Sequence, residues 1–108
     1  MAQIICKLPN NNYLLWTTVA DAPICHGMPR EQFDEFMEDM RGKRYMQLDH
    51  EVLVARADKY GTSSATPRTF HSLVELNRAG PGGSTLSFDE LYDEYANEPE
   101  DLTAKNSQ

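Results

Sequence analysis

The residues between 29 and 41 carry the pattern that most constrains the fold of this chain. Pro29 stands where proline is best tolerated in a helix, in the first turn, and Gly42 is favourable just past a helix end. Between them, large apolar side chains recur at the spacing of one helix face: Phe33, Phe36, Met37 and Met40. The pattern predicts an amphipathic helix over 29–41, which needs another layer of structure to cover its apolar face.

The N-terminal residues predict a β-hairpin. Over residues 3–8 apolar side chains alternate with others, and residues 13–19 are rich in aromatic and β-branched side chains. Pro9 and the asparagines that follow it separate these segments and tolerate tight turns. We therefore expect two strands, near 3–8 and 13–19, with one face of the hairpin on the helices and the other partly exposed.

Asp49 and Gly61 frame a second predicted helix. Asp49 is a natural N-cap, and Gly61 follows the last residue of an apolar pattern. The apolar face of this helix, over 49–60, would consist of Val52, Leu53, Ala57 and Tyr60. A third helix is expected over 88–96, where a serine and a glutamate three residues later have the spacing of a capping box.

Residues 69–78 fit two structures. Phe70, Val74 and Leu76 suit a strand. Phe70 and Val74 also suit a short helix, together with Leu73. We predict the strand.

These pieces assemble as one α+β domain over residues 3–97. The hairpin and one more strand would form a small antiparallel sheet, with three amphipathic helices covering one face. Residues 98–108 contain Pro99 and one large apolar residue, Leu102, so we expect them to form a flexible acidic tail.

The charge balance excludes some partners. The chain of 108 residues carries 17 acidic and 10 basic side chains, a formal net charge of −7. Nucleic acids and acidic membranes attract clustered cations, so we expect neither as a partner. The short basic cluster Arg41, Lys43 and Arg44 follows an acidic helix and suits the dipole at a helix end.

The N-terminus shows no targeting signal. It lacks the basic and apolar regions of a signal peptide, and no apolar run is long enough to cross a membrane. Cys6 and Cys25, at unrelated spacing, are expected to stay reduced. The sequence therefore predicts a cytoplasmic protein.

The residues that could bind a metal or act in catalysis do not have the spacing that such sites need. The candidate metal ligands, which form no local ligand pair, are Cys6, Cys25, His26, His50 and His71. An alternative to a metal site is a nucleophilic Cys25, activated as a thiolate beside His26, but the sequence marks no third group to orient the pair. The loop 80–83 lacks the lysine and hydroxyl of a phosphate-binding loop. We expect no metal, no cofactor and no enzymatic activity, with Cys6 in the hairpin core and the histidines on the surface or in loops.

Acidic side chains form the candidate binding residues. They occupy the outer positions of two predicted helices, at Glu35, Asp39, Asp89, Asp93 and Glu94. Such runs are either solvated faces or surfaces that dock onto a basic patch. Trp16, the single tryptophan, is either a core residue or an exposed anchor for a partner.

Several short stretches, in this order, resemble a family of small accessory proteins of tailed bacteriophages, especially those of actinobacteria. The matching stretches are residues 4–9, 13–23, 27–28, 61–64, 77–80 and 86–91. The resemblance implies a protein of the host bacterial cytoplasm that binds a host protein with a basic patch, as an inhibitor of a defence or nucleic-acid-handling factor. A small virion or assembly component, and an enzyme with an unrecognised site, are the alternatives.

Overall fold

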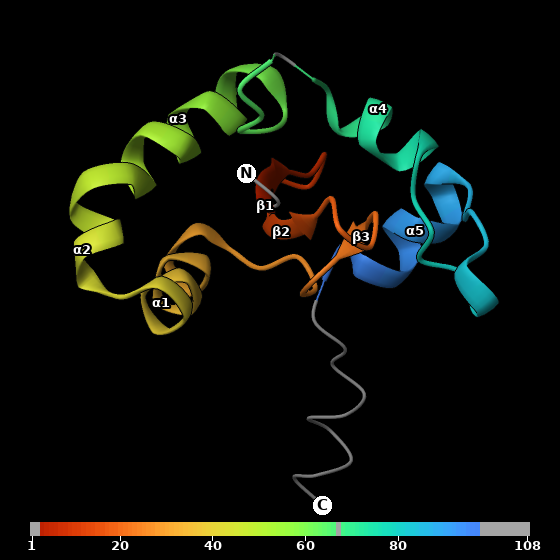
Figure 1. The fold of residues 1–108 in the computed structure, drawn as a ribbon, viewed down its shortest axis with the longest axis horizontal. Coiled ribbons are helices and arrows are strands. Elements are labelled where there is room, and N and C mark those ends of the chain that lie inside the picture. The colour runs from red at the N-terminus through yellow and green to blue at the C-terminus, as the bar shows by residue number, and fades with distance from the viewer. Residues whose placement is uncertain (1–2, 67, 98–108) are drawn as a thin grey trace, which may run out of the picture.

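A small sheet lies between two groups of helices in the computed structural model, which describes residues 3–66 and 68–97 (Figure 1). Its strands are β1 (Gln3–Lys7), β2 (Tyr13–Thr17) and β3 (Ala22–Pro23), all antiparallel in the order β1-β2-β3. The structure confirms an α+β fold with a three-stranded antiparallel sheet. Among the described residues, no helix combines the length and the apolar character needed to span a bilayer.

The predicted hairpin is confirmed. Residue Ile5 of β1 faces Leu15 of β2, and the turn between the strands contains Asn11 at a positive φ of 69°. Asparagine tolerates this left-handed conformation better than most residues. β2 ends at Thr17, two residues before the predicted end at Val19, whose side chain is exposed.

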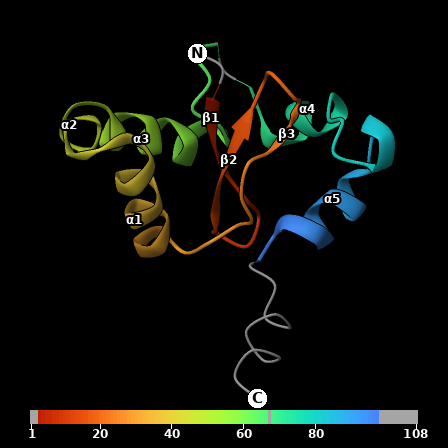
Figure 2. The ribbon, with the colours of Figure 1, turned by 60° about the horizontal axis from the view of Figure 1, so that its bottom comes forward.

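Helices cover both faces of the sheet, which corrects the expectation of one covered face (Figure 2). One set of strand side chains packs against the helices α4 (Phe70–Glu75) and α5 (Phe88–Tyr95): Ile4, Cys6, Leu14 and Trp16. The alternate set packs against the helices α1 (Arg30–Arg41) and α3 (Glu51–Tyr60): Ile5, Tyr13 and Leu15. Both strands are apolar at consecutive positions, as is usual for strands buried on both faces.

The helix α1 (Arg30–Arg41) forms where the sequence predicts it. Pro29 is its N-cap residue, and Gly42 ends it at a φ of 87°. Phe33 and Met37 are buried, whereas the predicted core residue Met40 is exposed. The buried face of α1 is therefore narrower than the apolar pattern.

The second predicted helix begins earlier than Asp49. Helical backbone runs from Lys43 through α2 (Lys43–Tyr45), the π-helical segment η1 (Met46–His50) and α3 (Glu51–Tyr60). Asp49 therefore lies inside helical backbone and is not the N-cap of η1 or α3.

The apolar face of α3 also differs from the prediction. Ala57 is buried as predicted, and so is Val54, which the prediction left out, whereas Val52 is 58% exposed and Tyr60 is also exposed. Together with the buried His50, Val54 and Ala57 follow the i, i+4 and i+7 spacing of one helix face. Gly61 ends α3 in the left-handed region, as expected.

Residues 69–78 contain a helix, so the predicted strand is wrong. The helix α4 (Phe70–Glu75) is capped by Thr69, whose side chain accepts a hydrogen bond from the backbone N–H of Ser72. Phe70 and the other helical apolar positions are buried, whereas Leu76 is 57% exposed. The strand interpretation depended on Leu76 facing inward, and β3 takes the place of the third strand.

The last helix is α5 (Phe88–Tyr95), which follows the short 3-10 turn η2 (Pro81–Gly83). Ser87 and Glu90 form the predicted capping box. The end of α5 is held to the rest of the fold by Gly27, whose backbone N–H donates to the Tyr95 carbonyl at 2.6 Å. The predicted tail at 98–108 lies outside the described residues.

Candidate functional site

The predicted acidic residues all lie on the surface, but on two separate helices. Glu35 and Asp39 are exposed on α1, and Asp89, Asp93 and Glu94 are exposed on α5. Because α1 and α5 pack against opposite faces of the sheet, the structure does not bring the two groups together (Figure 1). Each helix therefore presents its own acidic surface.

The exposed carboxylates of α5 form its acidic surface, whereas Leu91 on the same helix is buried. We call this surface the acidic stripe, and it consists of Asp89, Glu90, Asp93 and Glu94. A hydrogen bond from the backbone of Ser87 holds the pKa of Glu90 below its ordinary value. Within residues 3–66 and 68–97, no ion pair involves a carboxylate of the stripe. The stripe therefore presents charge that the described fold does not neutralise.

An apolar hollow of about 370 Å³ lies at the start of α5. We call it the α5 hollow, and its lining consists of Lys7, Leu8, Pro9, Thr69, Phe70, His71 and Phe88. The ring of His71 stacks on Phe88 with centroids 4.3 Å apart, and Phe70 contacts Phe88 edge to face at 5.7 Å. Phe88 lines the hollow and directly precedes Asp89 in the chain, so the hollow lies at the N-terminal end of the acidic stripe.

Trp16 belongs to the core and not to this surface. Its side chain is 1% exposed and contacts Phe70 edge to face, with centroids 6.3 Å apart. Of the two alternatives for Trp16, the structure supports the core residue and contradicts the exposed anchor.

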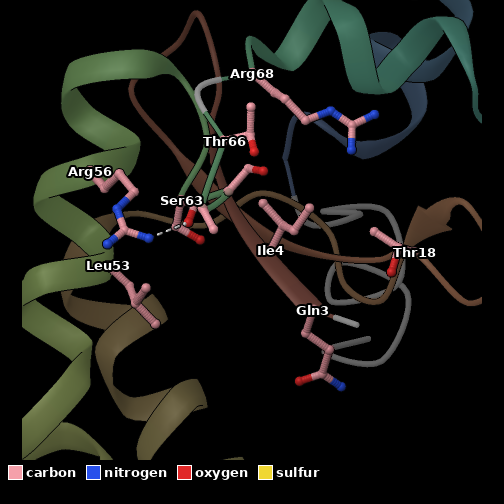
Figure 3. Close-up of a pocket in the computed structure, with 10 residues that line it drawn as sticks. Gln3, Ile4, Thr18, Leu53, Arg56, Ser63, Thr66 and Arg68 are labelled. Carbon is pink, nitrogen blue, oxygen red and sulfur yellow. Dashed lines mark hydrogen bonds between the residues drawn. The ribbon is translucent and has the colours of Figure 1, made fainter. Parts of the chain in front are cut away.

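A second hollow contains arginines that the sequence analysis did not identify as site residues (Figure 3). We call it the arginine pocket. It has a volume of about 240 Å³, and its lining consists of Gln3, Ile4, Thr18, Leu53, Arg56, Ser63, Ser64, Ala65, Thr66 and Arg68. The lining comes from β1, the end of β2, α3 and the loop after α3, so no local spacing in the sequence could predict it.

Hydrogen bonds fix the loop that forms one wall of the arginine pocket. Ser63 accepts at Oγ from the backbone N–H of Ile5 at 2.9 Å, and its own N–H donates to the Ile5 carbonyl at 2.9 Å. Arg56 donates from Nη1 to the Ser63 carbonyl at 3.1 Å. Thr62 donates from Oγ1 to the backbone carbonyl of Arg68 at 2.6 Å. The wall is thus attached to both β1 and α3.

The cysteines make structural contacts. Cys6 is buried in the hairpin core as predicted, and burial, followed by the nearby Cys25, raises the pKa of its thiol far above the ordinary range. Cys25 accepts at Sγ from the backbone N–H of Leu15 at 3.4 Å, while the ring of His26 stacks on Tyr95 instead. The adjacent Cys25 and His26 therefore have separate surroundings.

His50 is fully buried, which corrects the expectation that all three histidines lie on the surface or in loops. Its Nε2 is 2.6 Å from Oδ1 of Asp34, and its Nδ1 has no hydrogen-bond partner among the residues that the structure describes. In the part of the chain that the structure describes, no three His, Cys, Asp or Glu side chains form a group that could hold a metal ion.

Comparisons of the chain with protein-family models, with curated proteins and with solved structures give no match. The resemblance to bacteriophage accessory proteins therefore stays a prediction.

Proposed function

We propose that this protein is a non-catalytic binding protein whose α5 surface docks onto a basic partner protein. The observation that carries this proposal is the position of the acidic stripe directly beside the α5 hollow. Protein interfaces commonly combine an apolar centre with a polar or charged rim. The α5 hollow supplies the apolar centre, and the acidic stripe supplies the charged rim.

The charge of the stripe supports the capture of a partner. Asp89, Asp93 and Glu94 form no ion pair with another described residue, and α5 contains no lysine or arginine. Summed surface charge attracts an oppositely charged partner and raises the association rate. The chain's net charge of −7 acts in the same direction.

The α5 hollow supports specificity. Phe88 is half-buried there and stacks on the exposed His71, so an apolar side chain of a partner can cover both rings. Buried aromatic contacts contribute much of the binding energy at protein interfaces. The partner we propose has a basic patch with an apolar side chain at its centre.

The resemblance to bacteriophage accessory proteins suggests where that partner occurs. We propose a host bacterial protein, such as a defence or nucleic-acid-handling factor, which would be inhibited when its basic surface is covered. Nucleic-acid-binding surfaces are rich in lysine and arginine, which is the chemistry that the acidic stripe fits.

A comparative capture experiment tests this function. Tagged wild-type protein, Asp93→Lys/Glu94→Lys and the matched control Glu35→Lys/Asp39→Lys are each incubated with actinobacterial lysate. We expect a basic host protein that wild type and the α1 control retain and that the α5 variant loses. If no protein depends on the α5 charges in this way, the proposed function is wrong.

A further inference from the structure

The arginine pocket concentrates positive charge in an acidic chain. Arg56 and Arg68 line it, and no aspartate or glutamate of the described residues does. Neither guanidinium takes part in a salt bridge with another residue that the structure describes. An anion that enters this pocket therefore meets the Arg56 guanidinium, with Arg68 at the rim and no described carboxylate in the lining.

Arg56 is held in place on one wall of the pocket. Its guanidinium lies beside Leu53 and Ser63, and its hydrogen bond to the Ser63 carbonyl is the only one it makes with the described residues (Figure 3). A guanidinium carries five N–H donors in a rigid fork. The N–H groups of Arg56 that face the pocket can therefore donate to a ligand.

Arg68 stands at the opposite rim, and its guanidinium points away from Arg56 (Figure 3). The backbone of Arg68 is fixed by Thr62, whereas its side chain makes no hydrogen bond with the described residues. A long side chain on an anchored backbone can rotate toward a bound anion. Arg68 is thus suited to act as the second, adjustable contact.

Uncharged polar groups complete the pocket. Ser64 and Thr66 bring hydroxyl groups that can donate hydrogen bonds, and Oε1 of Gln3 is buried without a hydrogen-bond partner among the described residues. A phosphate monoester has three strong acceptor oxygens for the donors. The organic part of such an ester can donate a hydrogen bond to Gln3.

We propose that the arginine pocket binds the phosphate group of a small molecule, with Arg56 as the fixed contact and Arg68 as the adjustable one. The volume of about 240 Å³ is smaller than a site for a drug-sized ligand and suits a phosphate with a short organic group. This site is separate from the α5 surface and does not depend on the proposed function.

The test is a titration of the full chain with inorganic phosphate at constant ionic strength, followed by amide NMR. We expect saturable shifts at residues 63–66 and at Arg56. Arg56→Gln and Arg68→Gln should each weaken phosphate binding at least about tenfold, because each removes a charge-assisted contact. Arg78→Gln, an exposed arginine outside the pocket, is the matched control and should bind phosphate as wild type does.

Three results would overturn the proposal. They are shifts that do not saturate or that spread over lysines and arginines outside the pocket, unchanged binding in both pocket variants, and equally tight binding of acetate. Arg56→Gln also removes the bond to Ser63, so its amide spectrum shows whether the fold is kept. Arg68→Gln removes no such bond and gives the result if Arg56→Gln does not fold.

Discussion

Oδ1 of Asp34 lies 2.6 Å from Nε2 of the buried His50, and Nε of Arg30 reaches the same oxygen at 2.8 Å. Arg30 also donates from Nη2 to Glu51 at 2.7 Å. The carboxylate of Asp34 therefore joins α1 to η1, and Arg30 extends the connection to α3. This connection holds the π-helical turn that points His50 into the core.

We predict that Asp34→Ala lowers the free energy of unfolding by about 2 kcal/mol, because hydrogen bonds to charged groups contribute more than neutral ones. The neighbouring Glu35 is exposed and forms no ion pair with a described residue, so Glu35→Ala is the matched control. Its effect should stay within about 0.5 kcal/mol. Chemical denaturation of both variants measures the difference, and equal effects would show that the Asp34 connection contributes nothing.

The burial of Trp16 gives a prediction that needs no substitution. As the single tryptophan, it reports on its own surroundings, and its side chain is 1% exposed. Acrylamide should quench its fluorescence weakly in the native state and strongly in denaturant. Strong quenching in the native state would contradict the buried position of Trp16.

The same burial predicts the effect of a substitution. Trp16→Ala should lower the free energy of unfolding by about 3–5 kcal/mol, the range for large aromatic core residues.

Asp58 gives the chain a pH-dependent stability. Its carboxylate accepts from Tyr13 at 2.6 Å and from Lys7 at 3.0 Å. Burial opposes ionisation of Asp58, but these hydrogen bonds outweigh burial and lower its pKa. A lowered pKa in the folded state stabilises the fold above the unfolded-state pKa, about 3.9 for aspartate, and this contribution is lost as the pH falls through the folded-state pKa.

We therefore predict that wild type is more stable than Asp58→Asn by a constant amount near neutral pH, and that this difference shrinks below about pH 4. Urea denaturation at a series of pH values measures it. Asp39→Asn, at an exposed position without an ion pair to a described residue, is the control and should show no such loss. A difference for Asp58→Asn that grows as the pH falls has the wrong sign for this mechanism.

Local signals in the sequence predict those elements whose ends are set by a few neighbouring residues. Pro29 and Gly42 frame α1, and Ser87 with Glu90 starts α5, so both helices lie close to their predicted bounds. The hairpin is likewise a local structure with a turn that asparagine tolerates.

The predictions are wrong where tertiary packing decides which element forms or which residues are buried. The run from Tyr13 to Trp16 is apolar at every position, which indicates a strand covered on both faces, but the prediction placed helices on one face only. In α3 the buried Val54 and Ala57 follow the buried His50 at ordinary helical spacing, but His50 was expected on the surface or in a loop, so the prediction placed Val52 and Tyr60 on the inner face instead. α4 forms because its buried residues face the sheet at helical spacing, while Leu76 stays in solvent.

The candidate sites could be predicted only in part. The acidic stripe follows from the helical spacing of Asp89, Asp93 and Glu94, whereas its neighbour, the α5 hollow, also requires Leu8 and Phe70 from distant segments. The arginine pocket brings Arg56 of α3 beside Ser63 through pairing of the following loop with β1. No spacing in the sequence contains that arrangement.

We propose that the α5 surface docks onto a basic partner. The test is to measure the association rate of the captured host protein at a series of ionic strengths. We predict that the rate falls as salt is raised, because exposed charges are screened beyond about 8 Å at physiological ionic strength. At low salt, Asp93→Lys/Glu94→Lys should reduce the association rate about tenfold and change the dissociation rate less, whereas Glu35→Lys/Asp39→Lys, on the other side of the sheet, should have a smaller effect. An association rate that responds neither to salt nor to reversal of the α5 charges would contradict the claim.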